Sequence, residues 1–499
     1  MILLKFIQSD NVNSIKSFSF PQKVLIYFLS AFLFAYFAGF TMGDDGLRHI
    51  AFAAHSDVMI SWGNVFPHSL FVQSYDPWYT WHKILAFYLK IFSYQQVHIA
   101  VNTTVLFVFM MLVDSLLERY SNVKLGTLGI IVVLSIVLLS IDRYTNMRPD
   151  LLSGLYVMVA LILLKRWELL FFLTLLYAPL YYLFFLYTGS IGLMSLVLKN
   201  YRSFSAVFSA SALGFVLHLY LNGIDFLQTV KYLLTDQTLR KGLNVGEGAP
   251  LFEFLSLFNY FILVATMGAI VNYLVYRFYP YFYKKPLALF LLVTSVLWLA
   301  QVRYFYLLLP LILLYIFSEL QPIVRTIFSR FILYYLTRGW HILKLARNRR
   351  IFYLVVIPYT ALILAYSTQS NGKKLSQELE NKRYFKSEKF NNKRILSNTM
   401  TTDIYFGLYQ NPTIQFIPSC SIGWFEDSNS SMKDIYIQMM KKEGINEKEL
   451  KSLLDYLKAD YYIHTFKSEK QILTFDKLRN IGLQPMLIVD NKIIFKNTR

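Results

Sequence analysis

The feature that most constrains the fold is a series of long apolar runs that recurs through most of the chain. A helix needs about 20 consecutive apolar residues to cross the roughly 30 Å hydrocarbon core of a bilayer. Hydrophobic residues make up 56% and aromatic residues 17% of the 499, which excludes an ordinary soluble protein. The runs predict about eleven membrane spans, near residues 22–42, 96–116, 125–141, 150–164, 167–187, 189–199, 203–221, 254–275, 287–301, 304–320 and 351–367. The expected fold is therefore a mainly α, polytopic membrane protein.

The loops between these runs indicate how the chain is oriented. If the spans alternate, six basic loops fall on one side, and the positive-inside rule makes that side cytoplasmic. The basic residues concerned are Lys5, Lys16 and Lys23, Arg119 and Lys124, Lys165 and Arg166, Lys199 and Arg202, Arg277, Lys284 and Lys285, and those of residues 321–350. Contact with anionic lipid explains the formal net charge of +19, so no nucleic-acid partner is expected. The N-terminus is expected in the cytoplasm, and residues 43–95, 142–150 and 222–253 on the outer side.

The composition changes near residue 370, where Lys, Asn, Ser and Glu replace the apolar runs. The stretch "NEKELKSLLDYLKA" has helical periodicity, whereas "DYYIHTF" and "PMLIVDNKIIFK" are typical of strands, the second with a tight turn at "DN". We therefore expect a transmembrane domain over residues 1–367, which includes the first outer loop 43–95. A polar linker over 368–395 and a small extracytoplasmic α/β domain over 396–499 are expected to follow.

The stretch "TMGDDGLRHIAFAAH", residues 41–55, follows the first apolar run directly. Asp44 and Arg48 are four residues apart, as are Asp45 and His49, so each pair shares one face of a helix. In one interpretation, an aspartate caps a short helix that lies in the membrane interface. In the other, the pair supplies a general base or a metal ligand at the mouth of a membrane cavity, because ionisable groups at that depth are usually functional.

A second group of charges lies in "RYTNMRPDLLSG", which is expected on the same outer face. Arg148 and Asp150 flank Pro149, and a proline suits the first turn of a helix, where its missing N–H costs nothing. Asp150 could therefore be a helix cap, or it could converge with Asp44 and Asp45 in one site.

Further cationic residues fall on this face. Arg303 interrupts an apolar stretch in "QVRYFYLLLP" and is followed by Tyr304. The arginine either extends its side chain to the outer surface or binds an anion, and its planar guanidinium fits a phosphate. His82 and Lys83, in "WHKIL", are either part of an interfacial aromatic and basic belt or further donors to that anion.

Several other kinds of site are not supported. The chain contains no GxxxxGK[ST] or GxGxxG stretch, no GxSxG elbow and no His/Cys cluster with zinc spacing. The single cysteine, Cys420, rules out a disulfide within the chain. Soluble-type nucleotide binding and serine-hydrolase chemistry are therefore not expected.

The layout resembles that of GT-C membrane glycosyltransferases, and in outline the lipid A aminoarabinose transferases and the protein O-mannosyltransferases. The resemblance rests on the acidic pair after the first span, the long first outer loop, the Arg148–Asp150 segment and "RYFYLLLP" before a late span. It also extends to the layout of the whole chain, including the C-terminal domain. This chain has "HKIL" at 82–85, where relatives often have a Lys-Pro-Pro run.

The resemblance implies transfer of a sugar from a polyprenyl-phosphate donor to a lipid, glycan or protein acceptor, with inversion at the anomeric carbon. It places the enzyme in the bacterial inner membrane, with the reaction at the outer face. Asp45 or Asp44 is the expected base and Asp150 a supporting carboxylate. Arg303, Tyr304, Arg148, His82 and Lys83 are the expected phosphate contacts. Whether Asp44 and Asp45 bind a divalent metal ion stays open.

Two other functions fit the composition. An O-antigen ligase or polymerase shares the substrate class and the membrane setting. A transporter or lipid flippase would also place charges within the membrane, but it often shows paired internal repeats, and none is visible here. A scaffolding role is the least expected.

Overall fold

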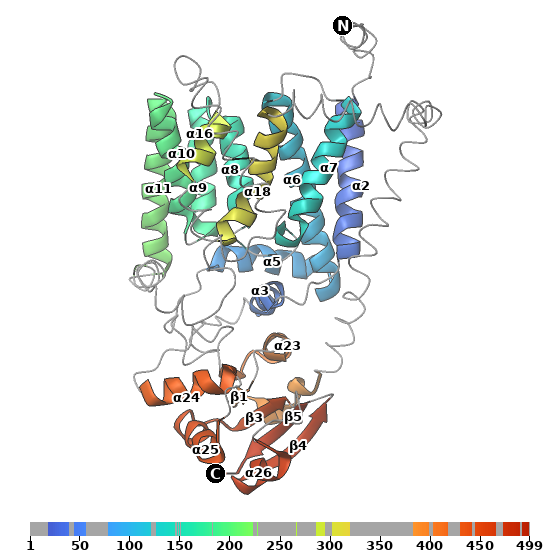
Figure 1. Ribbon diagram of the computed structural model, residues 1–499, viewed down its shortest axis with the longest axis vertical. Coiled ribbons are helices and arrows are strands. Elements are labelled where there is room, and N and C mark those ends of the chain that lie inside the picture. Colours follow the sequence, from blue (N-terminus) through green and yellow to red (C-terminus); the bar gives the residue numbers. More distant parts are fainter. Residues whose placement is uncertain are drawn as a thin grey trace, which may run out of the picture. The chain divides into compact units, whose positions relative to one another are not determined.

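The computed structural model is mainly helical and has a five-stranded sheet near the C-terminus (Figure 1). This bears out the expected class of a mainly α chain with a small C-terminal α/β region. The structure describes residues 18–38, 44–55, 78–120, 126–144, 147, 149, 151–181, 183–222, 227, 266, 286–294, 302–319, 383–398, 403–417, 430–441, 445–465, 473–489 and 492–498.

The chain forms two compact units, each described here by itself. The helical unit comprises Met1–Thr41, His98–Phe215 and Gly246–Gly372, and the mixed unit comprises Met42–Val97, Val216–Val245 and Lys373–Arg499. Residues 43–95, expected from the sequence to form an outer loop of the transmembrane domain, thus belong largely to one unit with the C-terminal segment. The reason is a tertiary contact between helices far apart in sequence, described below.

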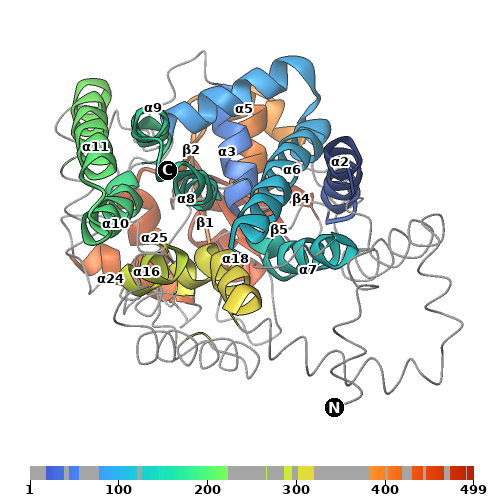
Figure 2. The ribbon, with the colours of Figure 1, turned by 90° about the horizontal axis from the view of Figure 1, so that it is seen from above.

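The helices of the helical unit lie side by side and are seen end on in Figure 2. Among the described residues, two helices are long and apolar enough to cross a membrane, Gln96–Tyr120 and Tyr201–Tyr220. The expected eleven spans stay a prediction. The elements are α2 (Phe20–Ala38), α6 (Tyr94–Tyr120), α7 (Gly126–Tyr144), α8 (Leu151–Leu163), α9 (Trp167–Tyr177), η2 (Ala178–Leu180), α10 (Phe184–Val197), α11 (Tyr201–Asn222), α16 (Pro286–Val293) and α18 (Val302–Glu319).

The structure corrects the boundary between two expected spans. The expected break at residue 188 is wrong, because Thr188 is buried inside α10. The chain instead leaves the α-helical path after Tyr177, where the 3-10 turn η2 contains Pro179. A proline has no N–H to donate and its ring clashes with the preceding turn, so the helix ends there. Apart from Thr266, the expected spans 254–275 and 351–367 lie outside the described residues.

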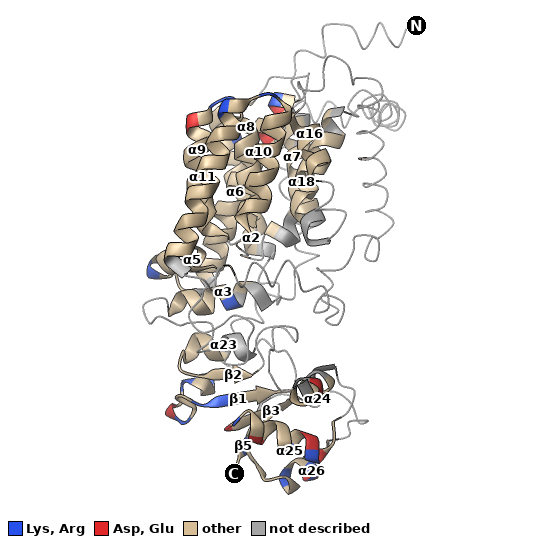
Figure 3. Ribbon diagram, turned by 90° about the vertical axis from the view of Figure 1, so that its left-hand side faces the viewer, with Lys and Arg blue, Asp and Glu red and all other residues tan. Residues whose placement is uncertain are grey.

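Basic residues of the helical unit gather at one end of the helices (Figure 3). Hydrogen bonds join the segments there: Arg119 at the end of α6 donates to the carbonyl of Ile162 over 2.5 Å, and Asn200 and Ser203 both donate to the carbonyl of Leu164. Charged residues at the helix ends joined here include Arg119 in the last turn of α6, Lys165 and Arg166 between α8 and α9, and Lys199 between α10 and α11. Helices that alternate in direction bring the ends of α6, α8 and α10 together in this way.

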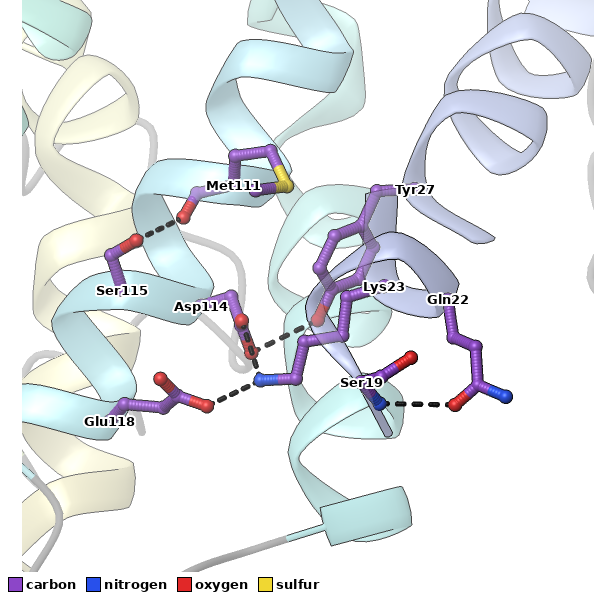
Figure 4. A network of polar contacts seen from close by, with 8 residues as sticks. All are labelled: Ser19, Gln22, Lys23, Tyr27, Met111, Asp114, Ser115 and Glu118. Atoms are coloured by element: carbon purple, nitrogen blue, oxygen red, sulfur yellow. Dashed lines mark hydrogen bonds and ion pairs between the residues drawn. The ribbon is translucent and has the colours of Figure 1, made fainter. Parts of the chain in front are cut away.

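A buried ion pair joins α2 to α6 (Figure 4). The Lys23 ammonium lies 2.8 Å from Asp114 Oδ2 and also pairs with Glu118, while the Tyr27 hydroxyl donates to Asp114 Oδ1 over 3.0 Å. Asp114 is only 7% exposed, and both of its oxygens have partners. The network therefore locks α2 against α6 without leaving a buried charge uncompensated.

The C-terminal sheet has the strand order β2-β1-β3-β5-β4. Strand β1 (Arg394–Ser397) runs parallel to both β2 (Gln415–Ile417) and β3 (Tyr461–Thr465). Strand β5 (Lys492–Asn497) is antiparallel to β3 and to β4 (Leu483–Val489). The strands expected in "DYYIHTF" and "PMLIVDNKIIFK" are thus confirmed, and the last two form the expected hairpin.

Helices cover both faces of this sheet. On one face α24 (Ser430–Lys441), α25 (Glu447–Tyr456) and α26 (Phe475–Asn480) pack on a core that includes Tyr462 and Phe495. The expected helix in "NEKELKSLLDYLKA" is α25, and it begins with a complete capping box between Asn446 and Glu449. Helix α23 (Asp403–Gln410), between β1 and β2, packs against the other face, which contains Phe416.

The folded C-terminal region begins earlier than the sequence analysis expected. The short turns η4 (Arg383–Lys386) and η5 (Glu388–Phe390) fall within the expected linker 368–395. Phe385 and Phe390 are 0% and 2% exposed and contact each other edge to face. Two buried aromatic side chains anchor this stretch although its average composition is polar, so residues 383–395 belong to the folded domain.

The ion pair of Figure 4 generates a stability prediction. We expect Asp114→Asn to lower the free energy of unfolding by about 2 kcal/mol, because the Lys23 ammonium then keeps only its exposed partner Glu118. The double variant Lys23→Met/Asp114→Asn should recover part of this loss, since it also removes the uncompensated charge. Thermal unfolding in detergent measures both effects. A double variant no more stable than Asp114→Asn would contradict the explanation.

Candidate functional site

The acidic pair opens a short helix. Helix α3 (Asp44–Ala54) starts at the first aspartate, so Asp44 and Asp45 are its first two residues. The amide groups at a helix start favour nearby carboxylates in their ionised form. The short helix expected after the first span is thus present, and His49 follows Asp45 by one turn on the same face.

Most of the described side chains of α3 are buried. It lies between α5 (Tyr79–Ile91) and α23 of the C-terminal domain, as Figure 1 shows. Arg48 and His49 are 5% and 1% exposed, and Ile50, Ala51 and Phe52 are buried as well. Charged and polar groups are rarely buried to this degree unless they have a structural or chemical role. The helix that carries the acidic pair is therefore an internal element of the mixed unit.

Two histidines meet between α3 and α5. His49 Nδ1 and His82 Nε2 are 2.8 Å apart, and both side chains are buried. Phe52 stacks on the His82 ring at 5.4 Å, and Trp78 meets the His49 ring edge to face. Two imidazolium ions could not form this bond, because both facing nitrogens would then be donors. One of the two facing nitrogens therefore donates and the other accepts, with the roles set by the tautomers.

The cations near this pair differ in their surroundings. The Arg48 guanidinium lies 5.0 Å from the centre of the Trp78 ring, in a buried position. The exposed Lys83 ammonium lies 5.3 Å from the centre of the Tyr79 ring on the same helix. Lys83 thus has the contact expected of an interfacial aromatic and basic belt, one of the two interpretations left open by the sequence.

The C-terminal end of α3 contacts the C-terminal domain. His55, directly after the helix, makes a 2.8 Å hydrogen bond through Nε2 with the backbone carbonyl of Tyr409 in α23. Burial lowers the pKa of the His55 imidazole below its ordinary value of 6.5, although the carbonyls of Tyr409 and Leu408 oppose the shift. The neutral ring therefore predominates at neutral pH and donates its Nε2–H to the carbonyl.

In the helical unit, the ends of three helices meet near the start of α18, which carries Arg303 and Tyr304. Tyr144 at the end of α7 donates a hydrogen bond to the carbonyl of Leu307 in α18 over 3.2 Å. A Cβ atom on Gly154, in the first turns of α8, would lie 2.3 Å from the Tyr144 hydroxyl, so only glycine permits this approach. Arg303 and Tyr304 occupy the first turn of α18, next to Leu307. The starts of α8 and α18 therefore meet the end of α7.

The two groups of expected site residues thus belong to different units. Asp44, Asp45, His82 and Lys83 lie in the mixed unit, whereas Arg303 and Tyr304 lie in the helical unit. Arg148 and Asp150, which precede α8 in sequence, fall outside the described residues, as do the side chains of Asp44, Asp45, Arg303 and Tyr304. The expected convergence of the outer carboxylates with Arg303 therefore stays a prediction.

The structure adds residues that the sequence analysis did not place in the site. His49 had a signal, since it follows Asp45 by four residues, but its partner His82 is 33 residues further along the chain. The contact of His55 with Tyr409 spans 354 residues and has no local signal. Among the described residues, no three His, Cys, Asp or Glu side chains gather as a metal site. A divalent ion at Asp44 and Asp45 stays a prediction.

A scan of this chain against protein-family models finds no match, and a search of curated proteins finds no significant similarity. The resemblance to GT-C enzymes therefore rests on the layout and on the short motifs quoted above.

The histidine pair generates a test by double-mutant cycle. We expect His49→Ala and His82→Ala each to lower the free energy of unfolding by about 2 kcal/mol, since each removes a partner from a buried hydrogen bond. The double variant should lose less free energy of unfolding than the sum of the two single losses, with a coupling energy of about 1 kcal/mol. Thermal unfolding of the three variants measures these losses. His464→Ala, at a buried histidine of β3, is the control, and its loss should add to that of His82→Ala with no coupling energy.

The lowered pKa of His55 predicts a pH dependence. A histidine whose pKa is lower in the folded state stabilises that state fully above pH 6.5, and the contribution is lost as the pH falls through the folded-state value. The protection factors of the α3 amides, which are corrected for the slower intrinsic exchange at low pH, should therefore fall on acidification below about pH 6. The variant His55→Gln, which has no titrating group, should show a smaller fall. An equal fall in both proteins would rule out His55 as the cause.

Proposed function

We propose that the protein is an integral-membrane glycosyltransferase that moves a sugar from a polyprenyl-phosphate donor to an acceptor hydroxyl, with inversion. The observation that carries the proposal is helix α3, a buried helix that opens with Asp44 and Asp45 and continues into Arg48 and His49. A rigid, buried element is the kind of support that a catalytic carboxylate needs, because small displacements of a reacting group are costly.

The acid–base chemistry follows from the reaction. The acceptor oxygen bonds to the anomeric carbon, the bond from that carbon to the phosphate oxygen breaks, and the acceptor proton passes to a base. Asp45 is the proposed base, with Asp44 as the alternative and Asp150 as a supporting carboxylate. The start of a helix favours the ionised carboxylate, which is the form that accepts a proton.

The leaving phosphate requires positive charge. Arg303 is the proposed main contact, because its guanidinium can bind two phosphate oxygens at once. Tyr304 and Arg148 are proposed as neighbouring contacts, and His82 and Lys83 as donors from α5. The approach of α7, α8 and α18 through Tyr144, Gly154 and Leu307 supports this grouping on the side of the helical unit. A divalent ion held by the aspartates would add further charge stabilisation.

The proposed setting is the bacterial inner membrane, with about eleven spans and the C-terminal domain on the outer side. Large apolar side chains are exposed along the described helices, as a lipid environment requires. Examples on α2, α9 and α11 are Leu25, Phe28, Tyr36, Phe172, Leu176, Phe208, Val216 and Tyr220. The basic end of the helical unit is assigned to the cytoplasm by the positive-inside rule. The acceptor is proposed to be a lipid, glycan or protein hydroxyl.

The direct test is release of polyprenyl phosphate by the purified protein incubated with a polyprenyl-phosphate sugar pool. The double variant Asp44→Asn/Asp45→Asn should lose about 10²-fold to 10⁴-fold of the rate, the range expected when a general base is removed. Asp434→Asn, at an exposed carboxylate of α24, is the matched control and should keep the wild-type rate. Undiminished release by the double variant would exclude the assignment. Movement of intact lipid-linked sugar without release would instead indicate a transporter or flippase.

A further inference from the structure

We infer that the C-terminal domain positions the acidic helix α3 through α23, and that His55 is the positioning residue of this contact. The inference deepens the proposed function and rests on it in one respect, namely that α3 carries the catalytic carboxylates. It assigns the domain a supporting role in catalysis instead of acceptor binding.

Helix α23 is held firmly on the sheet. A Cβ atom on Gly407 would lie 2.6 Å from Phe416 Cζ and 3.2 Å from the Phe385 ring, so the glycine allows the helix to touch both aromatic side chains. Leu408, the next residue, is fully buried. Phe416 belongs to β2 and Phe385 to η4. The position of α23 is therefore set by the core of the C-terminal domain.

The end of α23 offers a hydrogen-bond acceptor to α3. The last carbonyl groups of a helix have no partner within the helix and are satisfied by side chains or water. His55 Nε2 donates to one of them, the carbonyl of Tyr409, over 2.8 Å, and the two rings lie 6.5 Å apart. Since this nitrogen is committed to a backbone carbonyl, His55 acts on the position of α3 and not on a substrate.

Because α3 is short, a contact at its C-terminal end affects the position of the acidic pair at its N-terminal end. The helix has 11 residues, with Asp44 at one end and Ala54, next to His55, at the other. Such a helix is about 16 Å long, so a tilt of about 10° pivoting at the α5 contact displaces its ends by 1–2 Å. A misplacement of about 1 Å can cost roughly 10²-fold in rate. The His49–His82 bond fixes the middle of α3 on α5, and the His55 bond fixes its C-terminal end.

The test compares three variants in the full-length protein in detergent. His55→Ala removes the donor, whereas His55→Gln keeps an N–H donor at a similar reach. Lys451→Ala, in an ion pair on α25 at the opposite face of the sheet, is the control. We expect amide hydrogen exchange in α3 to be about tenfold faster in His55→Ala, and within about twofold of the wild type in the other two. Unchanged exchange in His55→Ala would overturn the inference.

An activity measurement separates positioning from a general effect on stability. At a temperature where every variant is folded, His55→Ala should lower kcat by about 10²-fold, leave the donor KM unchanged and be rescued by His55→Gln. In an Asp45→Asn background, His55→Ala should cause little further loss, because it acts through the carboxylates. Equal losses of kcat in the wild-type and Asp45→Asn backgrounds would overturn the positioning role. A raised acceptor KM with unchanged kcat would also overturn it and would indicate a role in acceptor binding.

The exchange measurement and the activity measurement test the positioning inference and the proposed function independently. If the wild-type protein transfers no sugar, the proposed function is wrong, and the exchange measurement still decides whether α23 holds α3. If transfer is observed and His55→Ala changes neither exchange nor rate, the positioning inference is wrong and the proposed function stands.

Discussion

The burial of α3 is the constraint on which the arrangement of the mixed unit depends. A helix that opens with two carboxylates and carries Arg48 and His49 is costly to remove from water, so its polar groups need nearby partners. The structure supplies them from both sides, with His82 of α5 bonded to His49 and Tyr409 of α23 bonded to His55. The second of these contacts joins the segment around α3 to the C-terminal domain, although 354 residues separate His55 from Tyr409.

The helical unit satisfies its polar and charged groups in a different way. Its helices satisfy their own backbone groups, and the described charges gather where the helices end (Figure 3). The Lys23–Asp114 pair joins α2 to α6 near that end, and every charge of this network has a partner. The close approach of Tyr144, Gly154 and Leu307 fixes the starts of α8 and α18, where Arg303 is placed. Contacts between helices thus hold both of the segments that carry residues assigned to the proposed reaction.

Local features of the fold could be predicted because their causes lie within a few residues. Helix α25, strand β3 and the hairpin of β4 with β5 are examples, and each is confirmed. The break after Tyr177 was misplaced because apolar content alone gives no boundary, and Pro179 was the better signal. Residues 383–395 were assigned to a linker because two buried phenylalanines do not alter the average composition of a polar segment.

The sequence by itself determined the helical character, the position of the acidic pair at the start of a short helix, and the C-terminal α/β region, because periodicity, capping and turn residues act over short distances. Tertiary structure alone decided which surfaces meet. The pairing of His49 with His82, the bond from His55 to Tyr409 and the glycine contact between α8 and α7 depend on how distant segments pack. Such contacts produce no repeating pattern in the sequence, because each of them needs only one suitable side chain on each element.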